Sequence, residues 1–345
     1  MKILIATSGV PFIRGDAEIL ADSLREALSK AGHEAELVVI PFQPYAPDRI
    51  PDQILACRLL DLTETCGVRI DRVIGLTFPA YLIPHPNKVI WLLHQHRAAY
   101  ELWDQPAADS LMHYPDGFVI REAIRQADRE LIPEARAVYA PSQSVAERLR
   151  RYSGITSEPL YHPPANASLF HQGPAGDYFF CPGPVNSANR QWLATQAIAQ
   201  CREPVRIRFA GEPGRLTGQA RSADKLKGSD RIEWLGMLSE DQKRDLYANC
   251  LGVIFSPGDE DYGYVTLEAM LSAKPVIATA DSGGPLEFIL AERTGLVARP
   301  TPESLAEAMD TLWADRRRAA AVGEAGRAHY QDLHISWANV VEKLL

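Results

Sequence analysis

Residues 255–285 read FSPGDEDYGYVTLEAMLSAKPVIATADSGGP, and this stretch carries the pattern that decides the fold. An apolar run ends at Ser256, a Pro-Gly turn and an acidic loop follow, and a helical segment begins near Tyr264. A second apolar run, residues 275–279, follows the helical segment. Strand, loop, helix and strand in this order are typical of a parallel α/β sheet.

The same alternation extends over the whole chain and predicts an α/β, doubly wound fold. The strands predicted for the first half are 2–7, 34–40, 72–76, 89–94 and 137–140, and those for the second half are 178–181, 206–210, 232–235, 251–256 and 275–279. Leu20, Leu24 and Leu28 predict a helix that ends at Gly32. A helix over 145–152 has Ser142 or Ser144 as its expected N-cap.

The length of 345 residues is too great for one ordinary hydrophobic core and predicts two domains. Residues 161–177 are rich in Pro and Gly and lack periodicity, so they are the expected linker. We therefore expect domains at 1–172 and 173–329. Two domains of this kind would place a ligand cleft between the carboxyl ends of two parallel sheets.

The charge balance excludes a nucleic-acid partner. Lys and Arg number 36 against 44 Asp and Glu, which gives a net charge of −8, and neither half of the chain has a basic excess. If the protein handles an anionic ligand, a few local cations and backbone N–H groups must hold it.

The cysteines and the apolar runs indicate the compartment. The five cysteines form no C-x-x-C pair, so a zinc ribbon or a disulfide scaffold is not expected and a reducing cytoplasm fits best. No apolar run approaches the roughly 20 residues of a membrane helix. The first residues are interpreted as a buried strand rather than a signal peptide, because Arg14 and Asp16 follow and no small-residue cleavage site is present.

Two carboxylates, Glu260 and Glu268, flank the predicted start of a helix. A helix N-terminus presents unpaired N–H groups and partial positive charge, and Gly263 lets a ligand approach the backbone closely. The amides from Gly263 to Val265 can therefore hold a phosphate while the carboxylates accept bonds from sugar hydroxyls. On spacing alone, a solvated loop acid at 260 and a helix-surface acid at 268 remain equally good interpretations.

Asp259 and Asp261 form a D-x-D pattern, by which other transferases hold a divalent metal against a diphosphate. A three-residue acidic match is weak, since acidic loops recur by chance. We expect neither a metal nor a cofactor.

These segments resemble the nucleotide-sugar-dependent, retaining glycosyltransferases of family 4 (group 1), which have the GT-B fold. The likeness rests on the E-x7-E pattern at 260–268, on LEAMLSAKPVIA and GGPLE after it, and on VYAPSQSVAERLRRYSGI and WLGMLSEDQKRDLYAN upstream. The resemblance implies two Rossmann-like domains that face each other across a cleft. It implies that the first domain binds the acceptor, that the second binds the nucleotide sugar, and that a helix at about 330–345 packs back onto the first.

The resemblance also implies roles for single residues. Glu260 would bond hydroxyls of the donor sugar and Glu268 the ribose, while the amides of Gly263, Tyr264 and Val265 would meet the diphosphate. In the first domain, His94 would face the reacting sugar, with His96 as the competing choice, and Gly15 would lie beside the donor phosphate.

The chain departs from the family pattern at two places. The usual Arg and Lys at the start of the second domain are Pro184 and Asn189 here, which leaves Arg190 as the nearest cation for the diphosphate. In the loop after the first strand, Asp16 stands where the family often has glycine. Asp16 is either a carboxylate near the phosphate path or a helix N-cap, and Arg14 either compensates for it or is a solvated arginine.

The leading prediction is a cytoplasmic retaining glycosyltransferase that moves a sugar from a nucleotide-diphosphate sugar to a glycan or lipid-linked acceptor, in surface polysaccharide or glycolipid biosynthesis. The alternative is a catalytically weak nucleotide-sugar-binding homologue or a partner subunit of another transferase. Weak association with the inner face of the membrane through Arg148, Arg150 and Arg151 is a further expectation, although a solvated helix face explains these arginines more simply.

Overall fold

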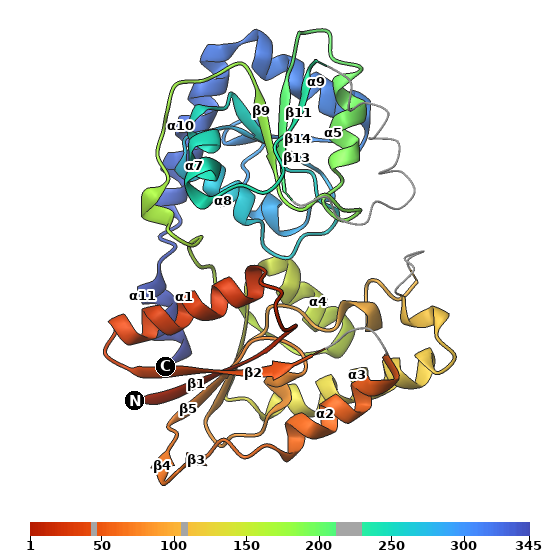
Figure 1. Cartoon of the computed structure of the whole chain (residues 1–345), viewed down its shortest axis with the longest axis vertical. Helices are drawn as coiled ribbons and strands as arrows, with labels where there is room; N and C mark the ends of the chain where they lie inside the picture. Colours follow the sequence, from red (N-terminus) through yellow and green to blue (C-terminus); the bar gives the residue numbers. More distant parts are fainter. Residues whose placement is uncertain (43–46, 105–109, 212–229) are drawn as a thin grey trace. The chain divides into compact units, whose positions relative to one another are not determined.

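The computed structural model describes residues 1–42, 47–104, 110–211 and 230–345, and the chain forms two compact units. Met1–Ala165 together with Ser336–Leu345 make the first unit, and Asn166–Ile335 make the second. Each unit is a parallel sheet with helices on both faces (Figure 1), which confirms the predicted fold class. In the described ranges, no helix combines the length and the apolar character that crossing a membrane requires.

The first unit is built on a six-stranded sheet whose neighbouring strands all run parallel. Its order is β2 (Glu34–Pro41), β1 (Lys2–Gly9), β5 (Arg72–Gly75), β6 (Lys88–Trp91), β7 (Ala137–Ala140) and β8 (Glu158–Pro159). A small hairpin of β3 (Glu64–Thr65) and β4 (Val68–Arg69) precedes β5. The strand order reverses between β1 and β5, so the loops after these strands diverge and leave room for a ligand at the carboxyl edge.

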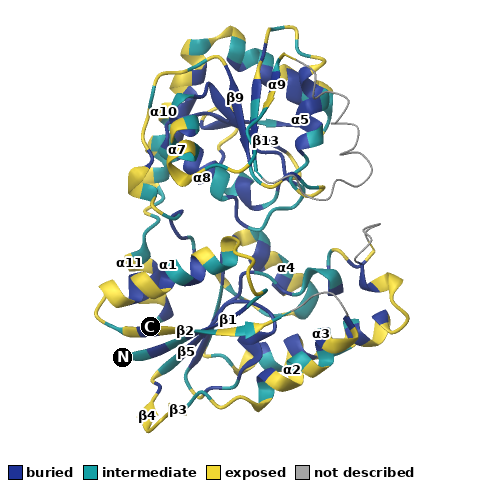
Figure 2. Ribbon diagram, in the orientation of Figure 1, coloured by how far each residue is buried: buried dark blue, intermediate teal, exposed yellow. Residues whose placement is uncertain are grey.

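Helices cover both faces of this sheet with apolar side chains. One core lies under α1 (Asp16–Lys30) and α11 (Trp337–Leu344), and the other lies under α3 (Gly117–Leu131) and α4 (Gln143–Ser153), with α2 (Ile50–Leu59) contributing Ile50. Figure 2 shows the central strands as buried, whereas the edge strand β2, the β3–β4 hairpin and the outer helix surfaces are largely intermediate or exposed. The predicted amphipathic helix with Leu20, Leu24 and Leu28 on one face is therefore confirmed as α1.

The ends of α1 and α4 follow from local chemistry. After α1, Gly32 adopts a left-handed φ of 87° while its own N–H and that of His33 bond the carbonyls of Ser29 and Leu28, each at 3.0 Å. The Ser142 hydroxyl accepts the Val145 N–H at 3.1 Å and is the N-cap of α4, whereas Ser144 lies inside the helix.

The second unit repeats the design with the Rossmann strand order. Its sheet runs β11 (Ile232–Trp234), β10 (Ile207–Ala210), β9 (Phe179–Pro182), β12 (Gly252–Ile254), β13 (Val276–Thr279) and β14 (Gly295–Ala298), all parallel. One face is covered by α5 (Gln191–Ile198) and α9 (Pro302–Ala314), and Figure 1 places α7 (Glu240–Asn249), α8 (Tyr264–Leu271) and α10 (Arg316–Asp332) on the other. The edge strands β8 and β14 have no counterpart among the predicted strands.

The boundary between the units lies at Ala165, ahead of the expected position at residue 172. The N–H groups of Gly173 and Gly176 bond the Ala248 and Asn249 carbonyls at 3.0 and 2.9 Å, and Lys274 Nζ bonds the Gly173 carbonyl at 3.0 Å. A Cβ on Gly173 would lie 2.8 Å from the Ala248 oxygen. The glycines of this stretch therefore mark close packing against the end of α7, not a free linker.

The chain returns to the first unit at Ser336, later than the expected position near residue 330. Ser336 caps α11, whose Val340 and Leu344 are fully buried in the core beneath α1. The Trp337 ring packs edge-on against Trp91, with 6.4 Å between the ring centroids. Ten residues separated in sequence from the rest of this unit thus complete its core.

Candidate functional site

The reversal of strand order between β9 and β12 brings two loops together at the carboxyl edge of the second sheet. Residues 183–190 follow β9 and residues 255–263 follow β12. The Gly258 N–H donates to the Ala188 carbonyl at 2.9 Å and joins the two loops directly. Most of the predicted donor-binding residues lie on or beside these loops, so the structure brings this group together.

Arg190 holds these loops together through its hydrogen bonds. Its Nε donates to the Ser256 carbonyl at 2.8 Å, and its two Nη atoms bond both carboxylate oxygens of Asp281 at 2.7 and 2.8 Å. One Nη also donates to Thr279 Oγ1 at 2.9 Å and to the Pro257 carbonyl. The Arg190 side chain is 15% exposed. It therefore joins the loops after β9, β12 and β13, and it holds the pKa of Asp281 below its usual range.

These contacts bear on the diphosphate role predicted for Arg190, because they already use most of the N–H donors of its guanidinium.

The two residues that depart from the family pattern, Pro184 and Asn189, are bonded to each other in the loop after β9. Asn189 Nδ2 donates to the Pro184 carbonyl at 2.8 Å, and the Asn189 N–H bonds Asn186 Oδ1 at 2.7 Å. Where the family has two cations, this chain has a loop closed on itself by neutral hydrogen bonds.

The loop that carries Glu260 rests on the glycine pair at Gly283 and Gly284. The Glu260 N–H donates to the Ser282 carbonyl at 2.9 Å, and the Gly284 N–H donates to the Glu260 carbonyl at 2.8 Å. A Cβ on Gly283 would lie 2.7 Å from the Glu260 oxygen, and one on Gly284 would lie 2.6 Å from the Asp261 oxygen. The close packing of the glycine pair therefore fixes the position of the Glu260 backbone. Glu260 is partly exposed.

Helix α8 begins beside this loop, and its N-cap residue has no side chain that could accept from the first amides. Gly263 is the N-cap with φ 96°, and a Cβ there would lie 2.7 Å from Pro285 Cγ. Glycine is therefore required both by the backbone conformation and by packing. Tyr264 and Val265 are the first two helical residues and are partly exposed. Their N–H groups have no acceptor within the helix, which leaves partial positive charge at this end.

Glu268 lies on the buried side of α8, with 8% of the residue exposed. Its Oε1 accepts a bond from Lys243 Nζ on α7 at 3.0 Å. Burial raises the pKa of Glu268, and the positive charge of Lys243 opposes that rise. The interpretation of Glu268 as a solvated helix-surface acid is therefore wrong.

Asp259 and Asp261, the D-x-D pair, flank Glu260 in this loop, and Asp259 has a left-handed φ of 52°. Within the described part of the chain, no three His, Cys, Asp or Glu side chains gather as a metal site would require.

In the first unit, His94 follows β6 at the carboxyl edge of the sheet. Its Nδ1 lies 2.8 Å from the Gln95 carbonyl, and because a carbonyl can only accept, Nδ1 is the donor of this bond. His96, the competing choice, packs against Phe78 with 5.2 Å between ring centroids and edge-on against Phe42. Burial, followed by the neighbouring His94, lowers the pKa of His96 to about 4, which makes it a neutral packing residue.

A buried carboxylate, Asp128, supports the segment that carries His94. It accepts bonds from the Tyr81 hydroxyl at 2.8 Å, the Tyr100 hydroxyl at 2.7 Å and Gln95 Nε2 at 2.8 Å, and it is completely buried. Burial raises the pKa of Asp128 to about 6. The sequence analysis did not identify this group. A signal was present, because Asp128 is spaced four residues after Ile124 on the apolar face of a helix.

The loop after β1 holds the remaining predicted residue, Gly15. It is the N-cap of α1, and its N–H donates to Glu18 Oε2 at 2.9 Å. Asp16 is the first residue of the helix, so its interpretation as N-cap is wrong. Arg14 is 68% exposed and forms an ion pair with Asp22 on α1.

Arg190→Lys tests the fastening of the three loops. Lysine keeps the charge but cannot bond both Asp281 oxygens and two carbonyls at once, so we expect the free energy of unfolding to fall by about 1–3 kcal/mol. Urea unfolding of this variant is compared with Arg202→Lys, a substitution of an exposed arginine in the same unit. Equal stability of the two variants would contradict the fastening role.

Asp128→Asn tests the buried carboxylate through pH. Because the pKa of Asp128 rises from 3.8 to about 6 on folding, the native state binds the proton more tightly. The bound proton contributes about 3 kcal/mol to the free energy of unfolding. This contribution is complete below pH 4 and is lost as the pH rises through 6. Asp128→Asn should lack this step, because an amide does not titrate in this range. The check is urea unfolding between pH 4 and pH 7, and an unchanged step in the variant would refute the assignment.

Part of the chain matches a known family model. Residues 178–329 match the model of glycosyl transferases group 1. The alpha-1,3/1,6-mannosyltransferase ALG2 of Mus musculus is 39% identical over 97 residues, which are 28% of this chain and 23% of that protein. The O-antigen chain mannosyltransferase C of Escherichia coli is 24% identical over 184 residues, 52% of this chain and 48% of that protein. This chain thus spans about a quarter of the ALG2 protein.

Solved structures agree over the full length of the chain. Sucrose-phosphate synthase from Thermosynechococcus elongatus superposes with a TM-score of 0.78 at 17% identity, covering 99% of this chain and 97% of that one. Anabaena HepE, solved in complex with UDP and glucose, gives a TM-score of 0.70 at 18% identity over 100% and 98% of the two chains. At such identities the likeness shows the fold alone. The second unit is thus built on a glycosyl transferases group 1 domain, within a chain that has the GT-B fold.

Proposed function

We propose that this protein is a retaining glycosyltransferase of family 4 that takes its sugar from a nucleotide-diphosphate sugar. The observation that carries the proposal is the geometry of the E-x7-E segment: Glu260 on a loop supported by glycines, the N-terminus of α8 beside it, and Glu268 buried beside Lys243. The match to glycosyl transferases group 1 covers this same segment.

In this proposal each part of the donor has its own partner in the second unit. Glu260 accepts bonds from the sugar hydroxyls, and Glu268, whose orientation Lys243 fixes, accepts them from the ribose. The amides of Gly263, Tyr264 and Val265 bind the diphosphate through the positive end of the helix. Stabilisation of the departing phosphate then depends on backbone dipoles, with Arg190 acting mainly through the shape of the loops.

The first unit binds the acceptor, and His94 faces the reacting sugar. Because Nδ1 donates a hydrogen bond to the Gln95 carbonyl, Nε2 is the ring nitrogen that accepts one from a hydroxyl in this proposal. Exclusion of water during transfer protects the donor from hydrolysis. A metal is not required in this scheme, and we expect activity to persist in EDTA.

Mannose is the first sugar to test, because the ALG2 proteins of Mus musculus and Homo sapiens and an O-antigen chain protein of Escherichia coli, each similar to part of this chain, are named mannosyltransferases. Surface polysaccharide or glycolipid assembly in the cytoplasm, at the inner face of the membrane, is the proposed context. The solved neighbour HepE is described with UDP-glucose, which makes that donor the second probe.

The experiment measures nucleotide release and sugar transfer from GDP-mannose and UDP-glucose to a panel of glycan and lipid-linked acceptors. Glu260→Ala and Glu268→Gln should each lower kcat/KM at least 100-fold, because bonds that strengthen in the transition state are lost. Glu307→Ala, an exposed carboxylate on α9, is the matched control and should keep full activity. Wild-type activity in both site variants would overturn the proposal, and NMR of the product anomer tests retention.

A second candidate function is a nucleotide-sugar binder with little turnover, or a partner subunit of another transferase. The closed loop at 183–190 favours it, since Asn189 donates to the Pro184 carbonyl where the family places cations. Under this alternative, Pro184→Arg combined with Asn189→Lys should raise the rate of nucleotide release at least tenfold, because two positive charges then meet the departing phosphates. Calorimetry separates the cases: tight donor binding without release, under every acceptor, supports the binder, and an unchanged rate in the double variant counts against it.

A further inference from the structure

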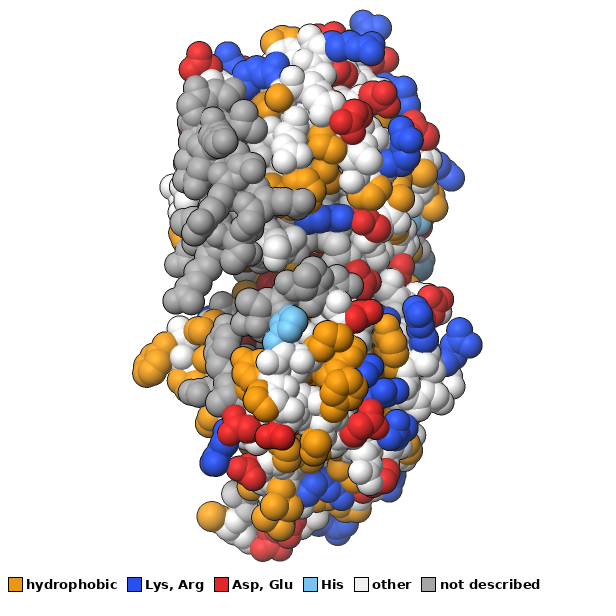
Figure 3. All heavy atoms as spheres, turned by 90° about the vertical axis from the view of Figure 1, so that its right-hand side faces the viewer, with side chains coloured by type: hydrophobic (Ala, Val, Ile, Leu, Met, Phe, Trp, Pro, Cys, Tyr) orange, Lys and Arg blue, Asp and Glu red, His pale blue; other side chains and the backbone are white. Residues whose placement is uncertain are grey.

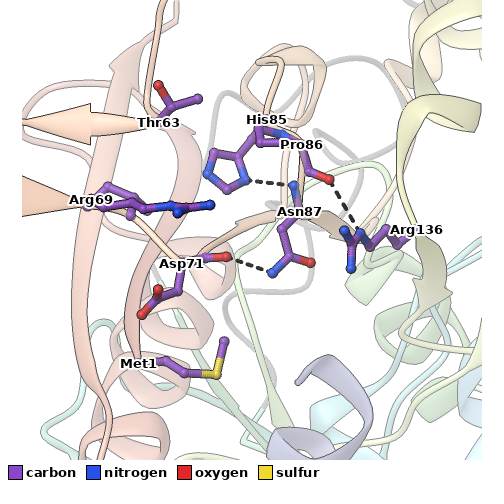
Figure 4. A pocket seen from close by; sticks show the side chains of 9 residues that line it. Met1, Thr63, Arg69, Asp71, His85, Pro86, Asn87 and Arg136 are labelled. Atoms are coloured by element: carbon purple, nitrogen blue, oxygen red, sulfur yellow. Dashed lines mark hydrogen bonds between the residues drawn. The ribbon is translucent and has the colours of Figure 1, made fainter.

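A cavity of about 580 Å³ lies at the opposite edge of the first sheet from His94. Its walls are the segments that lead into β5, β6 and β7, so it opens at the amino ends of these strands (Figure 4). The eight residues from Asn87 to His94 include the whole of β6, and an extended chain of that length spans about 23 Å. The cavity is therefore separate from the proposed transfer site.

The walls of the cavity are held in place by hydrogen bonds. Asn87 donates its backbone N–H to His85 Nδ1 at 3.1 Å and its side-chain amide to the Asp71 carbonyl at 2.6 Å. Arg136 Nε donates to the Pro86 carbonyl at 3.3 Å. Figure 4 shows these bonds with Arg69 on the other side of the cavity. The polar groups of this cavity are thus set before any ligand arrives.

Two arginines of this cavity, Arg69 and Arg136, form no ion pair with any residue in the part of the chain that the structure describes. Carboxylates are nevertheless near: Asp71 lines the wall, Glu64 lies opposite Arg69 in the β3–β4 hairpin, and Asp61 acts on His85. Arg72 adjoins them, with Nη2 donating to Asn87 Oδ1 at 3.2 Å. Burial, reinforced by the charge of Arg136, lowers the pKa of Arg72. The carboxylate in the wall, Asp71, already accepts the Lys2 N–H at 2.7 Å.

His85 adds a buried donor to the same wall. It is 8% exposed, and burial lowers its pKa, so the ring is neutral at physiological pH. Because Nδ1 accepts the Asn87 N–H, the ring proton is on Nε2. That Nε2 is buried and makes no hydrogen bond within 3.5 Å to any described residue, although the Ile70 backbone acts on the ring from nearby. A buried donor left without an acceptor is costly, and an acceptor supplied by a ligand would remove that cost.

We propose that this cavity binds a small phosphorylated metabolite, with the phosphate between Arg69 and Arg136 and its organic part in the remaining volume. Two arginine forks and a neutral N–H match a phosphate group, which carries more than one negative charge and three acceptor oxygens. The volume lies in the range of small-molecule sites, well above what one oxyanion fills. Among the described residues, Arg136 uses only its Nε within the fold, on the Pro86 carbonyl, so its Nη groups remain for a ligand, in contrast to those of Arg190.

The experiment is calorimetric titration of the full chain with glucose 6-phosphate and with inorganic phosphate. Arg69→Gln combined with Arg136→Gln should weaken glucose 6-phosphate binding at least tenfold, because two charged hydrogen-bonding groups are lost. Arg129→Gln combined with Arg317→Gln removes the same charge from two exposed arginines elsewhere and should leave the affinity within twofold. Glu268→Gln should also leave it unchanged, which separates this site from the donor site.

Retention of binding in the Arg69/Arg136 double variant, or no binding to the wild-type chain, overturns the proposal. Loss of binding in Glu268→Gln assigns the phosphate to the donor site and overturns it as well. Tighter binding of glucose 6-phosphate than of inorganic phosphate supports an organic phosphate as the ligand, and equal affinities overturn that assignment. None of these results depends on whether sugar transfer is detected.

Discussion

The bidentate pair between Arg190 and Asp281 is the constraint on which the carboxyl edge of the second sheet depends. Arg190 itself has a left-handed φ of 50°, a strained conformation for a side-chain-bearing residue, and it persists because the surrounding bonds determine it. The same guanidinium holds the Ser256 and Pro257 carbonyls at the end of β12. The position of Glu260, a few residues further on, therefore follows from a side chain contributed by a different loop.

Arg190 thus acts at this edge through its hydrogen bonds with carbonyls and a carboxylate of the fold. On the face shown in Figure 3, basic and acidic side chains are interspersed on both units. At the start of α8 the positive potential comes from backbone amides, and Gly263 leaves them accessible. Lys243 and Arg190 are both engaged with carboxylates, so their charges act on the shape of the site more than on its net potential.

The sequence predicted the α/β class and each of its ten strands overlaps a strand of the two sheets, because central parallel strands are apolar and helices have a clear period. It missed β8 and β14, which are short edge strands whose pairing is a tertiary property. The E-x7-E segment could be found because its residues are close in sequence. The partners of Arg190 and Asp128 could not, since they come together only in the folded sheet. The glycines at 173 and 176 led to a predicted domain boundary that lies too late in the chain, because glycine occurs at sites of close packing as well as in linkers.

The return of the chain into the first unit has a consequence for its synthesis. On a ribosome, residues 166–335 are made before Trp337, Val340 and Leu344, which fill the core beneath α1. Until those residues emerge, Leu24 and Leu28 lack the neighbours that bury them. The core of the first unit is therefore incomplete until α11 is synthesised. The second unit already has all of its own residues at that point and is able to fold. The second unit can therefore complete its fold first, although its synthesis starts later.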